Sequence, residues 1–161
     1  MNADRKLADF DFVLTTPVGH LGVCVDGETV TAIDFLGTRR RVRPPQTPFA
    51  RHVAHQLSAY FDSAGTGFDL PVALDGTAFQ QRVWRALQSI PSGHTLTYGQ
   101  LAQRLHTSPR AVGNACRANP VPLIVPCHRV VARSGLGGFA GRTDGPEVAR
   151  KRWLLDHENP Q

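Results

Sequence analysis

The chain has 161 residues and a mass of 17.6 kDa, enough for one domain or for two small domains that share a core. Apolar residues make up 41% and charged residues 19%, a composition that is typical of globular proteins and excludes a disordered chain. The net charge of +5 is unevenly distributed, because residues 1–75 hold seven Lys/Arg and nine Asp/Glu (−2) and residues 76–161 hold eleven and four (+7).

Residues 10–35 are predicted to form β-strands. Apolar and polar side chains alternate through this stretch, which is the pattern of half-buried strands. The dipeptide Asp26-Gly27 lies between two apolar runs, and this predicts a hairpin turn because glycine adopts positive φ without steric cost. We therefore expect a small antiparallel sheet here.

One helix is predicted in the first half of the chain, over residues 47–62. Thr47 is a suitable N-cap, Pro48 is favoured at the first helical position, and apolar residues then recur at helical spacing. Residues 68–74 are predicted to form a further short strand. Together with the sheet, these elements predict an α+β unit, and they contain no group of residues typical of a catalytic site.

The second half is predicted to be mainly helical. Thr77 is the predicted N-cap of a helix that has one apolar face. The Pro-Ser-Gly sequence at 91–93 ends this helix. The sequence Thr97-Tyr98-Gly99-Gln100 fits a capping box, in which threonine and glutamine each bond a backbone N–H of the first turn. A short helix is therefore expected to follow as far as residue 105.

A second short helix is expected over residues 110–118, after a tight turn. Ser108 is its predicted N-cap and Pro109 its first residue. Two short helices joined in this way are typical of a helix-turn-helix, whose second helix enters a DNA groove, although other helical hairpins share the pattern. Arg110 and Arg117 are seven residues apart, near one face, and the small residues between them permit close approach to a nucleic-acid backbone.

Residues 76–134 carry seven arginines and neither Asp nor Glu. Such one-sided charge favours an anionic partner, nucleic acid first. A general preference for arginine is the alternative, because sixteen of the eighteen basic residues are arginine. That preference explains arginine in place of lysine, but it does not explain the missing acids.

Cys127 and His128 are the candidate reactive residues. Cys127 follows Pro126 and an apolar run at 121–125 that is predicted to be a buried strand. A cysteine reacts as its thiolate, and a neighbouring imidazole can act as the base. Adjacent side chains point apart in a strand, so contact between the two requires a turn or a bridging water. Taken alone, the pair is weak evidence for a reactive site, because a cysteine in an apolar stretch is more often a buried structural residue. A final helix is expected over residues 146–157.

The sequence gives little support for disulfide bonds, metal or cofactor sites, secretion or a membrane span. Three widely spaced cysteines do not form a disulfide framework, and Cys24 and Cys116 are expected to serve packing. Zinc-ligand and phosphate-loop motifs are missing, so neither a metal nor a cofactor is predicted. The N-terminal sequence has no signal-peptide pattern, and the longest apolar run is far too short for a membrane span. We expect a soluble protein of a bacterial-type cytoplasm, with a nuclear location also open.

Several segments carry a specific family pattern. They are NPVPLIVPCHRVV at 119–131, RAVGNACRANP at 110–120, GGFAG at 137–141 and WLLDHE at 153–158, with Tyr98 before them. Together they resemble the O6-alkylguanine-DNA alkyltransferases, also called methylated-DNA–protein-cysteine methyltransferases. The resemblance is strong over residues 76–158 and looser over 1–75. It implies a ribonuclease-H-like supporting domain (1–75) and a DNA-binding and alkyl-acceptor domain (76–161).

The resemblance implies a direct, self-inactivating DNA repair reaction. In the family, a damaged guanine is flipped out of the duplex and its O6-alkyl group is transferred to the motif cysteine, here Cys127. Flipping is needed because the O6 substituent is otherwise enclosed in the stacked helix. The same resemblance extends to O4-alkylthymine. The expected partner is double-stranded DNA that bears O6-alkylguanine, and the protein is expected to act as a monomer.

The family resemblance also assigns roles to individual residues. His128 is expected to act through a water as the base, and Glu158 to orient the imidazole. Asn119 is expected to tie the acceptor turn to the helix-turn-helix. Tyr98 is expected to give its hydroxyl proton to N3 of guanine. Arg110 is expected to enter the base stack where the guanine was.

Further residues are expected at the DNA and the substrate. The other expected DNA contacts are Arg117, Ala111, Gly113 and Asn114, together with Tyr98, and the expected pocket residues are Pro122, Val130, Phe139 and Ala140. Phe139-Ala140 departs from the Tyr-containing pair common in the family, and the segment at 142–150 is longer than usual. These departures leave the shape of the substrate loop open. Arg129 is expected to be structural or to contact phosphate.

Two other classes of function remain open. A non-catalytic sensor of alkylated DNA, or a helix-turn-helix regulator, would bind DNA without taking up an alkyl group. A thiol hydrolase would turn over a small ester or amide and would not need DNA. Cys127 itself argues against the non-catalytic relatives, because these carry another residue at that position.

Overall fold

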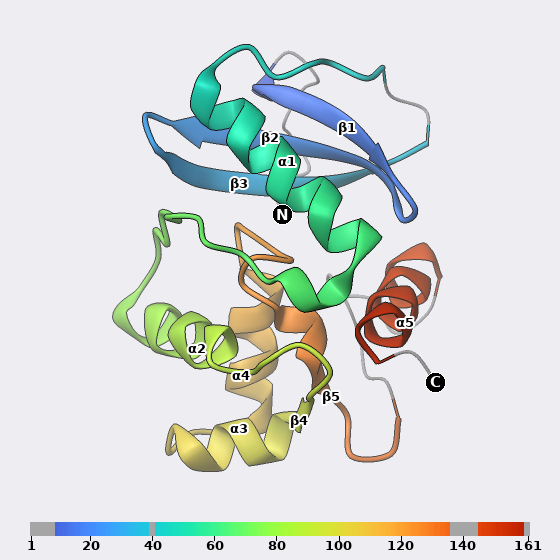
Figure 1. The fold of residues 1–161 in the computed structure, drawn as a ribbon. Coiled ribbons are helices and arrows are strands. Elements are labelled where there is room, and N and C mark those ends of the chain that lie inside the picture. The colour runs from blue at the N-terminus through green and yellow to red at the C-terminus, as the bar shows by residue number, and fades with distance from the viewer. Residues whose placement is uncertain (1–8, 39–40, 136–144, 160–161) are drawn as a thin grey trace. The chain divides into compact units, whose positions relative to one another are not determined.

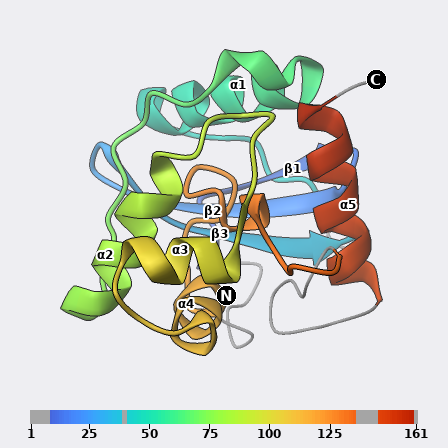
Figure 2. The ribbon, with the colours of Figure 1, turned by 90° about the horizontal axis from the view of Figure 1, so that it is seen from below.

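The computed structural model describes residues 9–38, 41–135 and 145–159. The chain forms two compact units, Met1–Leu74 and Asp75–Gln161, so the structural boundary lies one residue before the boundary drawn from the sequence. Figures 1 and 2 show the elements of each unit. Among the described residues, no helix is both long enough and apolar enough to cross a membrane.

The first unit is built on antiparallel strands in the order β1-β2-β3. These strands are β1 (Phe12–Thr16), β2 (Gly19–Asp26) and β3 (Thr29–Gly37). Phe12 pairs with Val23, which pairs with Ile33, and all three side chains are fully buried. Gly27 has a φ of +58° in the turn between β2 and β3, which confirms the predicted hairpin.

Helix α1 (Pro48–Asp62) begins and ends where the sequence predicts. The Thr47 hydroxyl accepts a hydrogen bond from the Ala50 N–H at 3.1 Å, which satisfies one of the unpaired donors of the first turn. The helix runs alongside the sheet (Figure 1) and buries an apolar face that includes Val53 and Leu57. A short 3-10 turn, η2 (Ala64–Thr66), follows it.

The short strand predicted at residues 68–74 is wrong. The segment meets β3 through an isolated parallel bridge between Val30 and Val72. The Val30 N–H donates to the Pro71 carbonyl, and the Ala73 N–H donates to the Val30 carbonyl, each at 2.9 Å. Proline has no N–H of its own, so Pro71 cannot extend the hydrogen-bonded ladder.

The second unit contains the capped helices that the sequence predicts: α2 (Ala78–Gln88), α3 (Tyr98–Arg104) and α4 (Pro109–Arg117). Thr77 and Thr97 both form complete capping boxes, while the Ser108 hydroxyl accepts from the Ala111 N–H. Figure 2 shows α3 and α4 side by side. The Trp84 indole N–H donates to the Ala115 carbonyl at 2.8 Å and so joins α2 to α4.

The strand predicted before Pro126 is also wrong. Residues 121–125 form a tight turn that is closed by a hydrogen bond from the Val125 N–H to the Val121 carbonyl. The chain then forms a 3-10 turn, η3 (Cys127–Arg129), and a short strand. This strand, β5 (Val130–Val131), pairs in parallel with β4 (Leu96–Thr97). Helix α5 (Pro146–Glu158) ends one residue later than predicted.

Candidate active site

Asn119 holds the turn that leads to Cys127. Its Nδ2 donates to the Val125 carbonyl at 2.8 Å, and its Oδ1 accepts from the Val121 N–H at 3.0 Å. Between these two points lies Leu123, which is buried and has a φ of +76°. This left-handed conformation costs a non-glycine residue about 1–2 kcal/mol. The Asn119 bonds therefore stabilise a conformation that backbone preference alone disfavours.

Cys127 begins η3 and is almost enclosed, with 8% of its surface exposed. Burial raises the pKa of the Cys127 thiol, and hydrogen bonding by Asn119 and the charge of Lys151 only partly oppose this. The resting side chain is therefore a protonated thiol. Because a thiolate is the reactive form, any nucleophilic reaction of Cys127 requires a nearby base.

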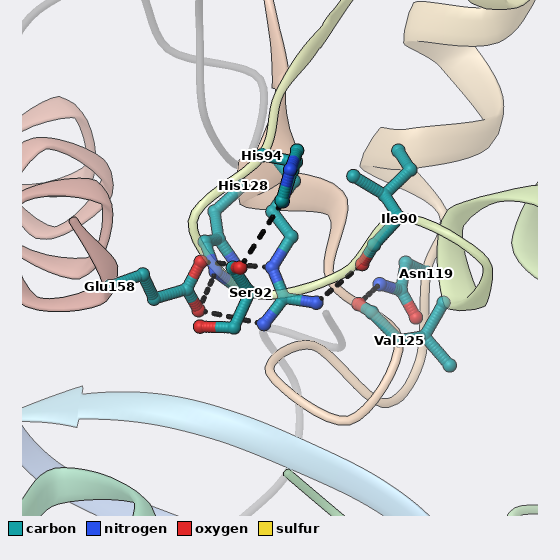
Figure 3. A network of polar contacts seen from close by, with 8 residues as sticks. Ile90, Ser92, His94, Asn119, Val125, His128 and Glu158 are labelled. Carbon is teal, nitrogen blue, oxygen red and sulfur yellow. Dashed lines mark hydrogen bonds and ion pairs between the residues drawn. The ribbon is translucent and has the colours of Figure 1, made fainter. Parts of the chain in front are cut away.

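His128 is buried beside Cys127 and contacts the last helix (Figure 3). Its Nε2 lies 2.7 Å from Oε2 of Glu158. Burial lowers the pKa of His128, and Glu158 raises it only in part. The imidazole is therefore neutral and donates its Nε2–H to the carboxylate. The Nδ1 atom is then a proton acceptor. It is buried and has no hydrogen-bond partner among the described residues.

Arg129 completes the polar network around the carboxylate. Its Nε donates to Glu158 Oε1 at 2.8 Å, and its Nη2 donates to Oε2 at 2.9 Å. Its Nη1 donates to the Ile90 carbonyl at 2.7 Å, just beyond the end of α2. The guanidinium is therefore held inside the protein, which agrees with the structural role expected of Arg129 and not with a phosphate contact.

Lys151 and Tyr98 lie close to each other, and the charge of Lys151 acts on Cys127. Lys151 is fully buried on α5, and its Nζ donates to the Val130 carbonyl at 2.7 Å. The same Nζ lies 5.5 Å from the centre of the Tyr98 ring. Burial lowers the pKa of Lys151 to about 8 and raises the pKa values of Tyr98 and Cys116 above their usual range. Tyr98 is therefore a neutral phenol.

Comparison with known proteins identifies the family. Residues 78–160 match the model described as "6-O-methylguanine DNA methyltransferase, DNA binding domain". The methylated-DNA–protein-cysteine methyltransferase of Mycobacterium tuberculosis is 40% identical over 153 residues, which cover 90% of this chain and 89% of that protein. The enzyme of the same name from Methanosarcina acetivorans is 36% identical over 147 residues, which cover 86% and 94%. The chain belongs to the methylated-DNA–protein-cysteine methyltransferase family.

Solved structures of the family have the same fold. The crystal structure of the Mycobacterium tuberculosis O6-methylguanine methyltransferase superimposes with a TM-score of 0.78 at 36% identity, covering 92% of each chain. The structure of the M. tuberculosis protein in complex with DNA also gives a TM-score of 0.78, at 39% identity over 91% of each chain. The fold of this family member is therefore that of the methyltransferases.

In this member of the family, the residues expected to contact DNA lie along α4, except Tyr98, which begins α3. Arg110, Asn114 and Arg117 are exposed, whereas Ala111 and Gly113 are half-buried. A Cβ atom placed on Gly113 would lie 4.0 Å from Cε1 of Tyr98, so this face of α4 passes beside the tyrosine ring. The structure thus brings Tyr98 close to the helix that the sequence predicts to contact DNA.

The expected pocket residues are only partly described. Pro122 and Val130 are buried in the turn and in β5, respectively. Phe139 and Ala140 lie outside the described residues, as does the start of the longer segment at 142–150. Within the described parts of the chain, no group of three or more His, Cys, Asp or Glu residues could hold a metal ion.

Sequence reasoning missed two contributors to the site. It did not single out Lys151, although Lys151, Leu154 and Glu158 recur at i, i+3 and i+7 and are the buried residues of α5. A lysine at that spacing, on the face that also carries Glu158, is the signal that could have found it. It also gave no partner for Arg129.

Proposed function

We propose that this protein removes alkyl groups from the O6 atom of guanine in double-stranded DNA and takes them onto the sulfur of Cys127. The observation that supports this most directly is the arrangement of a buried thiol, a buried imidazole and a carboxylate, contributed by Cys127, His128 and Glu158. These residues lie in the segment that matches the family. The thioether that forms does not hydrolyse, so each molecule acts once.

The first step is proton transfer from the Cys127 thiol to Nδ1 of His128 through a water. Nδ1 is suited to this role because it is buried, carries the lone pair and has no partner among the described residues. The Glu158 carboxylate on Nε2 stabilises the imidazolium that results. The positive charge of Lys151 favours the thiolate. A thiolate whose conjugate acid has a high pKa is also intrinsically more nucleophilic.

The second step is displacement at the alkyl carbon. The Cys127 thiolate forms a C–S bond as the C–O6 bond breaks, and the electron pair of that bond passes to the guanine. The Tyr98 hydroxyl gives a proton to N3, so that guanine leaves as a neutral base. A neutral, half-buried phenol beside α4 is suitably placed for this donation.

Access to the lesion requires base flipping, because the O6 group lies inside the base stack. We propose that α3 and α4 act as a helix-turn-helix and that Arg110 occupies the space of the flipped guanine. Arg117, Ala111, Gly113 and Asn114 would contact the DNA beside it. The crystal structure of the M. tuberculosis relative in complex with DNA supports a DNA-bound state.

The proposal extends to the substrate range and to the first unit. Pro122, Val130, Phe139 and Ala140 would line the pocket for the flipped base, and O4-alkylthymine would be a second substrate. The unit Met1–Leu74 would be a supporting domain of ribonuclease-H-like topology. Its antiparallel sheet and its helix α1 are compatible with that topology.

Binding and repair measured on the same duplex test this proposal. Wild-type protein should bind DNA containing O6-methylguanine and convert the lesion to guanine in proportion to the protein added. The Cys127→Ala variant should bind the same duplex and leave the lesion in place. Binding by the wild type without loss of the methyl group would favour a non-catalytic sensor and contradict the proposal.

A further inference from the structure

Arg129 is placed to set the charge state of the Glu158–His128 pair. Its Nε and Nη2 hold the two carboxylate oxygens at 2.8 and 2.9 Å, as a planar fork that matches the carboxylate. Oε2 is shared, because it also accepts from Nε2 of His128 at 2.7 Å. We propose that Arg129 is a positioning residue for alkyl transfer, which holds Glu158 as an anion and keeps His128 neutral and able to accept a proton.

The physical argument starts from the cost of burying charge. The Glu158 side chain is 1% exposed, and an isolated carboxylate at such a position would take up a proton or draw one onto its neighbour. His128 is that neighbour. With Arg129 present, the carboxylate charge is already balanced by the guanidinium, so the pair needs no proton on the imidazole. Without it, the carboxylate 2.7 Å from Nε2 favours the protonated form of His128, and the guanidinium charge that opposes this form is gone.

Other charged and titratable groups around His128 do not replace Arg129. Lys151 on α5 adds positive charge, which opposes protonation of His128 as Arg129 does, but it is hydrogen-bonded to the Val130 carbonyl. Cys127, Cys116 on α4 and Tyr98 on α3 are neutral in the resting state, because burial raises their pKa values. His94, after α2, is exposed and contacts the Ser92 carbonyl (Figure 3).

The third bond of the guanidinium gives the fork its orientation. Nη1 donates to the Ile90 carbonyl at 2.7 Å, so Arg129 joins the end of α2, the acceptor turn and the last turn of α5. A lysine at position 129 would keep the charge and lose the fork. A glutamine would remove the charge. The two substitutions therefore separate electrostatic from purely structural effects.

The inference rests on the proposed role of His128 as the base, and its test has one readout that does not need the reaction. The first measurement is nitrogen NMR of the wild-type histidines, with the His128 signals assigned by comparison with His128→Gln. We expect a neutral Nε2–H imidazole at pH 7. An imidazolium at pH 7 in the wild type would overturn the inference, and this result requires no variant of Arg129 to fold.

The second measurement is the pH dependence of His128 protonation and of the single-turnover rate with free O6-benzylguanine. In Arg129→Gln, the NMR midpoint and the acidic limb of the rate should both move up by about one pH unit or more, the size expected for loss of a neighbouring charge. In Arg129→Lys, both midpoints should stay near the wild-type values. Unchanged midpoints in Arg129→Gln, or equal midpoints in the two variants, would overturn the inference. If the wild type takes up no benzyl group, the proposed function fails, while the NMR midpoints still decide the role of Arg129.

Discussion

The polar side chains buried around Cys127 bond groups both near to them and far from them in the sequence. Asn119 bonds the backbone of its own loop, whereas Glu158 and Arg129 are 29 residues apart in sequence and Lys151 and Val130 are 21 apart. The sequence motif could place Asn119 and Glu158 in the site. It could not give the partners of Arg129 or Lys151, because these depend on where α5 packs.

Asn119→Ala should destabilise the second unit. The substitution leaves the buried Val121 N–H without its partner, which costs about 1–3 kcal/mol, and it removes one of the two hydrogen bonds to the Val125 carbonyl, which keeps the bond from the Cys127 N–H. We expect the free energy of unfolding, measured by urea denaturation, to fall by about 2–4 kcal/mol. Asn114→Ala is the matched control, because Asn114 is exposed on α4 and its loss should leave the free energy of unfolding nearly unchanged. Equal stability of wild type and Asn119→Ala would refute the role of these bonds.

The pH dependence of alkyl transfer should report His128. Burial holds the pKa of His128 below its usual value of 6.5, so the neutral base persists to lower pH than in a free imidazole. With Lys151 still charged, the single-turnover rate should therefore stay level from pH 7 to 6.5 and fall only on further acidification. Stopped-flow or quenched measurements across pH 5–8 would check this, and an acidic limb centred above pH 6.5 would contradict it.

At the scale of elements, capping signals predicted the helices well, whereas two apolar runs outside the helices were wrongly predicted to be strands. The caps of α1, α2, α3 and α4 involve residues within a few positions of one another, so the sequence contains the whole signal. The apolar run at 121–125 resembles a buried strand, but the side-chain bonds of Asn119, the bond from the Val125 N–H to the Val121 carbonyl and a left-handed Leu123 make it a turn. Apolar composition alone does not distinguish a buried strand from a buried turn.

The connection between α3 and α4 contains a strained residue. His106 is exposed and has a φ of +55°, in the left-handed region that favours glycine. His106→Gly removes this strain, and the gain exceeds the added flexibility of the unfolded chain. The free energy of unfolding should therefore rise by about 0.5–1 kcal/mol. His106→Val should lower it, because a β-branched residue tolerates positive φ poorly. Thermal or urea denaturation of both variants measures this, and a less stable glycine variant would refute the argument.

At the scale of the whole molecule, charge is segregated between the two units. Met1–Leu74 carries seven basic and eight acidic residues (−1), and Asp75–Gln161 carries eleven and five (+6), which together give +5. The sequence predicted the existence of both units because composition and element type change near residue 75. The expected cytoplasmic location and monomeric state stay predictions.

DNA binding should depend on the arginines of α4 and not on basic residues in general. Arg110→Ala and Arg117→Ala should each weaken duplex binding, and Arg117→Ala should also reduce the slope of log affinity against log salt by about 0.9 if one phosphate contact is lost. Arg41→Ala is the control, because it removes an exposed positive charge from the first unit. Arg110→Ala should also slow transfer from duplex DNA far more than transfer from free O6-benzylguanine. Equal effects of the three substitutions on DNA affinity would contradict this assignment.

The central claim is that Cys127 alone takes up the alkyl group, and intact-mass analysis with peptide mapping tests it most directly. Reduced, folded protein is incubated with an excess of duplex that contains O6-benzylguanine, weighed, and digested. One benzyl group per molecule, on the peptide that contains Cys127 and on neither Cys24 nor Cys116, is the predicted result. Unmodified protein, or an adduct on another cysteine, would contradict the account.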